Sequence, residues 1–128
     1  MALLIDTHAF LWWVGGSPRL SRRARTAIGR PGETCFVSLA SCWEVAIKLS
    51  LGRLKITAPL DRFLAEQMAA NGFLPLPLTL THVARVATLP FHHRDPFDRL
   101  LAAQALDESL AIVSVDRIFT RYGVQRVW

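Results

Sequence analysis

Short apolar runs alternate with helical periods along the chain. Residues 2–5 and residues 111–115 are apolar almost throughout, and an aspartate, Asp6 or Asp116, follows each run. Short runs of this kind are typical of strands that are buried on both faces. We expect further strands at residues 34–37, at 73–78, where prolines favour a sheet edge, and near 124–127.

Helical patterns fill the intervals between these strands. Apolar residues recur at three- and four-residue spacing between Leu39 and Leu51, which predicts a helix over residues 38–51 that ends at Gly52. Asp95-Pro96 places a proline at the first position of another helix. The other predicted helices cover residues 7–14, 21–28, 60–71 and 79–89, and a short one follows Asp116.

This alternation predicts one α/β domain over residues 1–128, with a parallel sheet of four to five strands between two layers of helices. The composition, with 52% hydrophobic and 20% charged residues, is that of a globular protein. No apolar run approaches the ~20 residues needed to cross a membrane. The first residues lack the basic segment of a signal peptide, so we expect a cytoplasmic protein.

Net charge and the two cysteines indicate which partners and which kinds of site to expect. The formal net charge is +5, which favours partners that carry phosphates. Five arginines cluster over residues 19–30, where they form either a solvated helix face or a surface for RNA or an acidic partner. Cys35 and Cys42 match no zinc-binding spacing, and we interpret them as buried thiols.

Four of the ten acidic residues fall where a site is expected. Asp6 and Asp116 follow strands, Glu44 lies in the helix after the second strand, and Asp98 lies in the first turn of the helix that Pro96 opens. All four belong to segments that begin at the carboxyl edge of a parallel sheet, where sites in such folds lie. Carboxylates crowded together repel one another, and a divalent cation such as Mg²⁺ or Mn²⁺ removes that conflict.

Each of these acids also has a purely structural interpretation. Asp6 and Asp116 are placed to cap the helices that follow them, and Ser41-x-x-Glu44 fits a capping box. Asp98 would sit at the third position of its helix, where acids favour the helix dipole. For Asp95 the capping interpretation comes first, although it is also a possible metal ligand.

The histidines give weaker signals. We expect His8 to line the first turn of its helix rather than to bind metal. His92-His93-Arg94 precedes the Asp98 helix, in a loop that suits either phosphate contact or a plain surface connection.

Four segments resemble the motifs of PIN-domain nucleases, specifically the VapC toxins of type II toxin–antitoxin systems. The first begins Ile5-Asp6-Thr7-His8, and the second covers residues 38–48 around Glu44. The third begins Asp95-Pro96-Phe97-Asp98, and the fourth begins Ser114-Val115-Asp116. The similar segments span residues 4 to 119, and the family often has threonine at position 114, where serine keeps the hydroxyl.

The resemblance implies a PIN fold and an endoribonuclease that is active with one or two Mg²⁺ ions, with Mn²⁺ as a substitute. Asp6, Glu44, Asp98 and Asp116 would hold the metal, with Asp95 in a supporting role. Water acidified by the metal would attack the phosphorus and leave a 5′-phosphate and a 3′-hydroxyl. Transfer RNA or ribosomal RNA are the expected targets, so cleavage would inhibit translation.

Four other functions are compatible with a small α/β domain, and the residues argue against two of them. A phosphoaspartate phosphatase would carry a second aspartate at the position of His8, and a response-regulator receiver would carry a phosphoacceptor aspartate on the third strand, where residues 73–78 offer none. An RNA-binding module or a PIN nuclease of RNA processing remains the alternative to a toxin.

Neighbouring tryptophans point to a partner. Trp12 and Trp13 are adjacent, so one narrow helix stripe cannot bury both, and we expect one to face another chain unless both pack internally. The resemblance implies a homodimer, a VapB-type antitoxin and higher assemblies of the two. An antitoxin arginine that reached Asp6 or Asp116 would compete with the metal.

Overall fold

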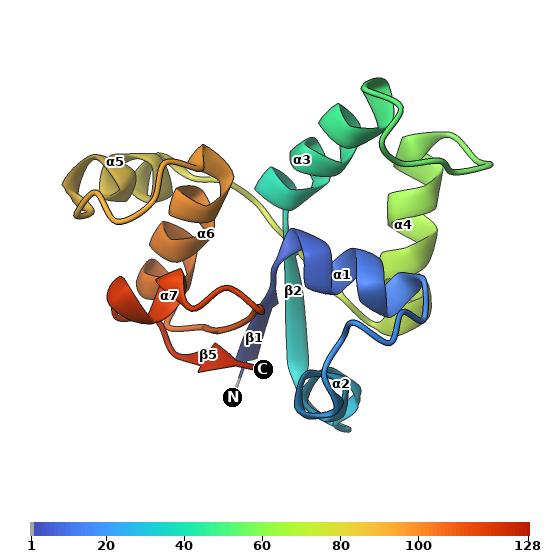
Figure 1. Ribbon diagram of the computed structural model, residues 1–128, viewed down its shortest axis with the longest axis horizontal. Coiled ribbons are helices and arrows are strands. Elements are labelled where there is room, and N and C mark those ends of the chain that lie inside the picture. Colours follow the sequence, from blue (N-terminus) through green and yellow to red (C-terminus); the bar gives the residue numbers. More distant parts are fainter. Residues whose placement is uncertain (1) are drawn as a thin grey trace.

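The computed structural model describes residues 2–128 and contains a five-stranded sheet in which every pair of neighbours is parallel. The strand order is β3-β2-β1-β4-β5 (Figure 1). The strands are β1 (Ala2–Ile5), β2 (Thr34–Ser38), β3 (Leu74–Leu76), β4 (Ala111–Val113) and β5 (Arg126–Val127). The predicted parallel α/β fold is therefore confirmed.

Helices cover both faces of this sheet, in the three-layer arrangement that the alternation predicts. In Figure 1, α1, α2 and α4 lie on one side and α5, α6 and α7 on the other, with α3 above the carboxyl ends of β1 and β2. The helices are α1 (Thr7–Val14), α2 (Arg22–Gly29), α3 (Leu39–Ser50), α4 (Leu60–Asn71), α5 (Leu80–Thr88), α6 (Pro96–Asp107) and α7 (Ile118–Arg121).

The two faces of the sheet bury two separate apolar clusters. On β1, Leu3 and Ile5 point into the cluster under α1, α2 and α4, whereas Leu4 points into the cluster under α6 and α7. All three side chains are at most 1% exposed, and burial of each stabilises the fold by roughly 1.5–3 kcal/mol. This double burial explains why the strand sequences are apolar rather than alternating.

The strand order changes direction beside β1. The chain proceeds from β1 to β2 to β3 on one side, and then crosses to β4 and β5 on the other side of β1. The backbone N–H of Asp6 donates to the carbonyl of Val113 at 3.1 Å, so the carboxyl ends of β1 and β4 are directly joined. Ligand sites of open parallel sheets lie outside such a reversal point.

Some strand boundaries differ from the prediction. The strand expected over residues 111–115 ends at Val113, because the backbone N–H of Asp116 turns back to the Ser114 hydroxyl at 3.0 Å and Val115 is exposed. The last strand is likewise shorter than residues 124–127. The strand expected over residues 73–78 is confirmed as an edge strand but covers only Leu74–Leu76.

Trp12 and Trp13 each pack against a ring within the chain, and a contact of either with a partner stays a prediction. Trp12 packs on Trp128, with 5.8 Å between ring centroids. Trp13 packs on Phe73 at 6.2 Å, and its indole N–H donates to Asn71 at 2.9 Å. Both tryptophans are half-buried, because neighbours from different elements cover the two sides of α1.

Two smaller expectations concern the cysteines and the membrane. Cys35 is buried and Cys42 half-buried, both as free thiols, and burial raises the pKa of Cys35 to about 11. Within residues 2–128, every helix is too short or too polar to cross a membrane.

Candidate active site

An acidic cleft of about 280 Å³ opens at the carboxyl ends of β1 and β4. Half of the chain's ten acidic residues line it, although the chain as a whole carries a formal charge of +5. The lining residues are Asp6, Thr7, His8, Glu44, Asp95, Asp98, Val115 and Asp116. The structure therefore brings all four predicted acids, together with Asp95, to one place.

Asp6 is the most deeply buried of these acids. It follows β1 directly, and its carboxylate accepts a hydrogen bond at 2.8 Å from the N–H of Ala9, so it caps α1. Asp6 as a whole is only 6% exposed to solvent. Burial raises the pKa of Asp6, an effect that the hydrogen bonds from Ser114 and Ala9 partly offset.

Glu44 reaches the cleft from the middle of α3. The hydroxyl of Thr7 donates to its carboxylate at 2.6 Å, which connects α3 to the first turn of α1. The capping box suggested for Ser41 and Glu44 does not form, because α3 begins three residues earlier and Ser38 is its N-cap. Glu44 is thus free of a capping role and is held instead by a side chain of the cleft.

Asp95 and Asp98 both lie at the start of α6. Asp95 caps the helix, as predicted, and accepts from the N–H of Phe97 at 2.9 Å and of Asp98 at 3.4 Å. Asp98 occupies the third helical position. Burial and the charge of Asp95, followed by the charges of Asp6, Asp116 and Glu44, raise the pKa of Asp98 to about 7.

Asp116 lies in the loop after β4, where its carboxylate accepts from the N–H of Ile118 at 3.0 Å. The Ser114 hydroxyl accepts from the backbone N–H of Asp116 and also bonds the side chain of Asp6. One small buried hydroxyl therefore sets the positions of two acids that are far apart in sequence.

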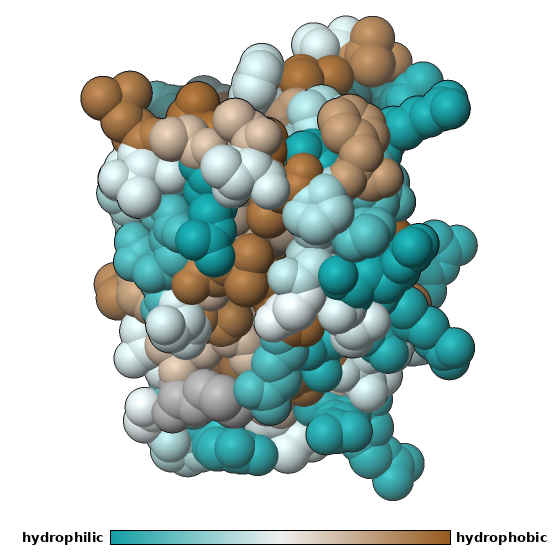
Figure 2. All heavy atoms as spheres, turned by 90° about the vertical axis from the view of Figure 1, so that its left-hand side faces the viewer, coloured by the Kyte–Doolittle hydropathy of each residue, from teal (hydrophilic) through white to brown (hydrophobic). Residues whose placement is uncertain are grey.

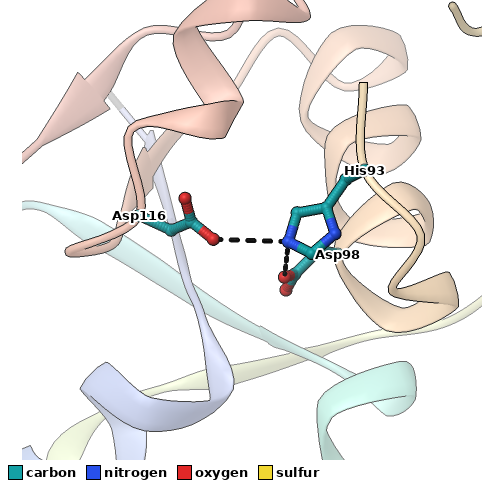
Figure 3. Close-up of side chains that lie close together, drawn as sticks. All are labelled: His93, Asp98 and Asp116. Atoms are coloured by element: carbon teal, nitrogen blue, oxygen red, sulfur yellow. Dashed lines mark ion pairs between the residues drawn. The ribbon is translucent and has the colours of Figure 1, made fainter. Parts of the chain in front are cut away.

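His93 lies against the acids of the cleft, a contact that the sequence did not predict, although its loop was considered for phosphate contact. Its Nε2 lies 3.2 Å from Oδ2 of Asp98 and 3.5 Å from Oδ2 of Asp116 (Figure 3). Its Nδ1 accepts from the N–H of Asp95 at 3.0 Å, so the neutral ring carries its proton on Nε2, toward the carboxylates. In the sequence, His93 stands two residues before the N-cap of α6, and this position is too common to identify a metal-binding or catalytic histidine.

The ligand atoms suit a hard divalent cation, but they are not equally close. Within the described chain, His93, Asp98 and Asp116 form the one group of metal-ligating atoms that all lie within 4.8 Å of one another. Asp6 and Glu44 line the same cleft outside that group. Burial is the main cause of the raised pKa values of Asp6 and Asp98, and neighbouring carboxylates add to it. A divalent cation bound there would favour the charged form of both acids.

Sequence comparisons place the chain among known nucleases. Residues 3–125 match the family model for the PIN domain. A curated relative, ribonuclease VapC22 of Mycobacterium tuberculosis (strain ATCC 25618 / H37Rv), is 31% identical over 118 residues, which are 90% of this chain and 87% of the relative.

Structure comparisons find the same fold at lower identity. A chain of VapBC2 from Rickettsia felis, crystallised with a DNA fragment from its promoter, matches over the full length of both chains with a TM-score of 0.71 and 12% identity. VapBC-1 from nontypeable Haemophilus influenzae matches 98% of this chain and 96% of its own, with a TM-score of 0.66 and 12% identity. FitAcB from Neisseria gonorrhoeae matches 97% and 95%, with a TM-score of 0.55 and 16% identity.

Proposed function

The chain belongs to the PIN-domain family and is a homologue of VapC ribonucleases, and from that premise we propose that it is the toxin of a type II toxin–antitoxin pair, which cleaves RNA with a divalent metal. Transfer RNA or ribosomal RNA is the proposed substrate, and inhibition of translation the proposed result. The observation that carries this proposal is the gathering of five carboxylates from separate segments into one cleft.

The cation proposed for this cleft is Mg²⁺, with Mn²⁺ as a substitute. Carboxylate oxygens are the ligands that both ions prefer. Asp6, Asp98 and Asp116 would hold it, with Glu44 at the rim and Asp95 in a supporting role. Bound there, the cation supplies positive charge that polarises the phosphodiester and makes water more acidic.

The protein's own residues orient the reaction. No serine or cysteine nucleophile is required, because water attacks the phosphorus while the bond to the 3′ oxygen breaks, and the leaving oxygen takes up a proton as the 3′-hydroxyl. Glu44, fixed by the hydroxyl of Thr7, or Asp98 at the start of α6 is suited to orient the attacking water.

The proposed substrate is a flexible RNA strand that enters the cleft from solvent, so one side of the cleft has to be open. Asp116 and His93 lie on its open side, with side chains 41% and 29% exposed, whereas Asp6 forms its floor. This gradient suits a phosphate that approaches from solvent and meets the buried carboxylates last.

An antitoxin is proposed to control the site. The structural neighbours named VapBC are complexes of that kind, and the cleft carries an excess of negative charge that an arginine would neutralise. A homodimer, able to join larger assemblies with the antitoxin, completes the proposal.

Cleavage of a labelled single-stranded RNA by the purified chain tests the proposed activity. We expect cleavage with Mg²⁺ or Mn²⁺, none in the presence of a chelator, and a loss of at least about a hundredfold in Asp6→Asn, which keeps the shape of the side chain and its cap but removes its charge. Arg121→Gln is a control at an exposed position that does not line the cleft. RNA binding without any metal-dependent cleavage would instead identify an RNA-binding module that has kept the fold.

A further inference from the structure

A second groove of about 370 Å³ adjoins the acidic cleft. Glu44 and Asp95 line both hollows and form the ridge between them. Beyond this ridge the groove is lined by three cations, Lys48 on α3, Arg53 after α3 and Arg94 before α6. The rest of its lining is apolar: Ile47, Leu51, Pro96 and Phe97. An RNA strand with one phosphate in the cleft would cross this ridge and place its next phosphates beside the three cations.

These three cations have no other structural task. Within residues 2–128, no side-chain hydrogen bond or ion pair is made by Lys48, Arg53 or Arg94, and both arginines are exposed. By contrast, Arg99 is buried and binds three backbone carbonyls, and Arg85 pairs with Asp107. The three cations share one groove beside the acidic cleft and make no side-chain interaction within the described part of the fold. They are therefore available to bind a negatively charged ligand.

Aromatic rings border the same groove. Phe97 lines it, and the ring of Trp43 meets that of Phe97 edge to face, with 5.1 Å between centroids and 71° between planes. Trp43 is 59% exposed, although large aromatic rings are usually buried. The contact with Phe97 fixes the orientation of Trp43, so that an unpaired base can stack on its open face.

We propose that this groove binds the single-stranded RNA segment next to the cleaved phosphate. Lys48, Arg53 and Arg94 hold backbone phosphates, and Trp43 stacks a base. The combination favours RNA over an acidic peptide, because one strand carries a phosphate at every nucleotide for the cations and a flat base for the ring. A base must be unpaired to reach the ring, so the groove selects single strands. This inference rests on the proposed ribonuclease function, which it extends to the substrate's flank.

Binding of a short labelled single-stranded RNA, measured by fluorescence anisotropy, tests the groove without depending on cleavage. Asp6→Asn serves as the background, so that the strand stays intact. The groove variant combines Lys48→Gln, Arg53→Gln and Arg94→Gln. The matched control removes the same charge from exposed positions on α4, α5 and α7, with Arg62→Gln, Arg85→Gln and Arg121→Gln, none of which lines the groove or the cleft.

Counterion release sets the expected size of the effect. Each lost phosphate contact lowers the slope of log affinity against log salt by about 0.7, so the groove variant should lose about two units of slope. At about 0.1 M salt this corresponds to roughly fivefold per side chain and roughly a hundredfold for all three. The control should change affinity by much less. Equal losses in the two triple variants would overturn the proposal.

Trp43 gives an independent test. Trp43→Leu should weaken binding of the RNA by about tenfold and leave binding of an abasic strand unchanged, because only the base contact is removed. Thermal melting checks that each variant folds, and Arg53→Gln alone, at an exposed position, gives a smaller loss of the same kind with no risk to folding.

The binding and cleavage experiments together distinguish a failure of the groove proposal from a failure of the ribonuclease proposal. Loss of RNA affinity in the groove variant, together with no cleavage by the wild-type chain, would support the groove and contradict the ribonuclease. Unchanged RNA affinity, together with lost affinity for a poly-glutamate peptide, would make the groove a protein-docking surface and overturn the proposal.

Discussion

Asp98 is a half-buried acid that lies among other carboxylates. Its side chain is 22% exposed, and four other carboxylates act on it. A carboxyl group with a pKa of about 7 is partly protonated at neutral pH, so the metal-free cleft relieves its own repulsion by holding a proton. A divalent cation would take the place of that proton, which couples metal binding to proton release.

Asp98→Asn should make the metal-free protein more stable, with a defined pH dependence. The folded-state pKa of about 7 exceeds the unfolded value of 3.8, so ionisation opposes folding, and the penalty grows from about pH 4 to pH 7. We expect the two proteins to be equally stable below about pH 4, and the variant to gain up to about 4 kcal/mol above pH 7. Urea unfolding in a chelator measures this, and a variant that is less stable at pH 8 would contradict carboxylate crowding.

His93 contributes one of the three grouped ligand atoms, but we predict that it donates to the carboxylates and does not bind the metal. Its Nδ1 accepts from Asp95, which leaves a proton on Nε2. His93→Ala should therefore lower the melting temperature of the metal-free protein, by the equivalent of about 1 kcal/mol, and change Mg²⁺ affinity by less than about tenfold. Thermal shift with and without Mg²⁺ tests both. A much larger loss of Mg²⁺ affinity would make His93 a ligand.

At the scale of elements, two helix N-termini gather the acids. Asp6 caps α1 and Asp95 caps α6, with Asp98 inside the first turn of α6. The partial positive charge of a helix N-terminus favours carboxylates, which offsets part of their repulsion. The capping and site interpretations of these acids are therefore not exclusive, since one residue serves both purposes.

Substitutions at Asp95 can separate its capping of α6 from a role in the proposed metal site. Asp95→Ser keeps a capping oxygen and should retain cleavage, whereas Asp95→Ala should lose about 1 kcal/mol of stability. Because the charge of Asp95 raises the pKa of Asp98, Asp95→Ser should also move the pH dependence of cleavage to lower pH. Loss of cleavage in a stable Asp95→Ser protein would instead place Asp95 among the metal ligands.

The sequence predicted elements better than their ends. Apolar runs identified β1 and β4 because both faces of these strands are buried, and the acids that follow them indicated one edge of the sheet. The end of β4 was misplaced, since the apolar pattern continues through the exposed Val115 while the turn depends on a Ser114 hydrogen bond. The position of His93 depends on the path of a loop, for which no periodic pattern exists.

At the scale of the whole molecule, exposed apolar side chains lie on the surface around α5. Leu80 is 88% exposed, Phe91 80% and Val83 54%. Figure 2, which views the side that carries α5, α6 and α7, shows apolar side chains at the top and down the centre of this face between polar flanks. Such side chains favour contact with another chain more than Trp12 and Trp13 do, because both tryptophans pack internally.

We expect the purified chain to be a dimer by light scattering at high micromolar concentration. Leu80→Ser combined with Val83→Ser should weaken the dimer with little loss of monomer stability, because exposed positions contribute little to the core. Trp13→Ala is the matched contrast, with an expected loss of roughly 2–4 kcal/mol of stability. A wild-type monomer under these conditions would contradict the dimer.

Everything proposed for the cleft depends on a divalent cation held by Asp6, Asp98 and Asp116. Titration with Mn²⁺, with the free ion measured by electron paramagnetic resonance, observes that binding directly and needs no RNA. We predict saturable binding by the wild-type chain and a loss of at least about tenfold in affinity in Asp98→Asn, whose fold is kept. Equal Mn²⁺ binding by the two proteins, or none by the wild type, would contradict the metal-dependent mechanism.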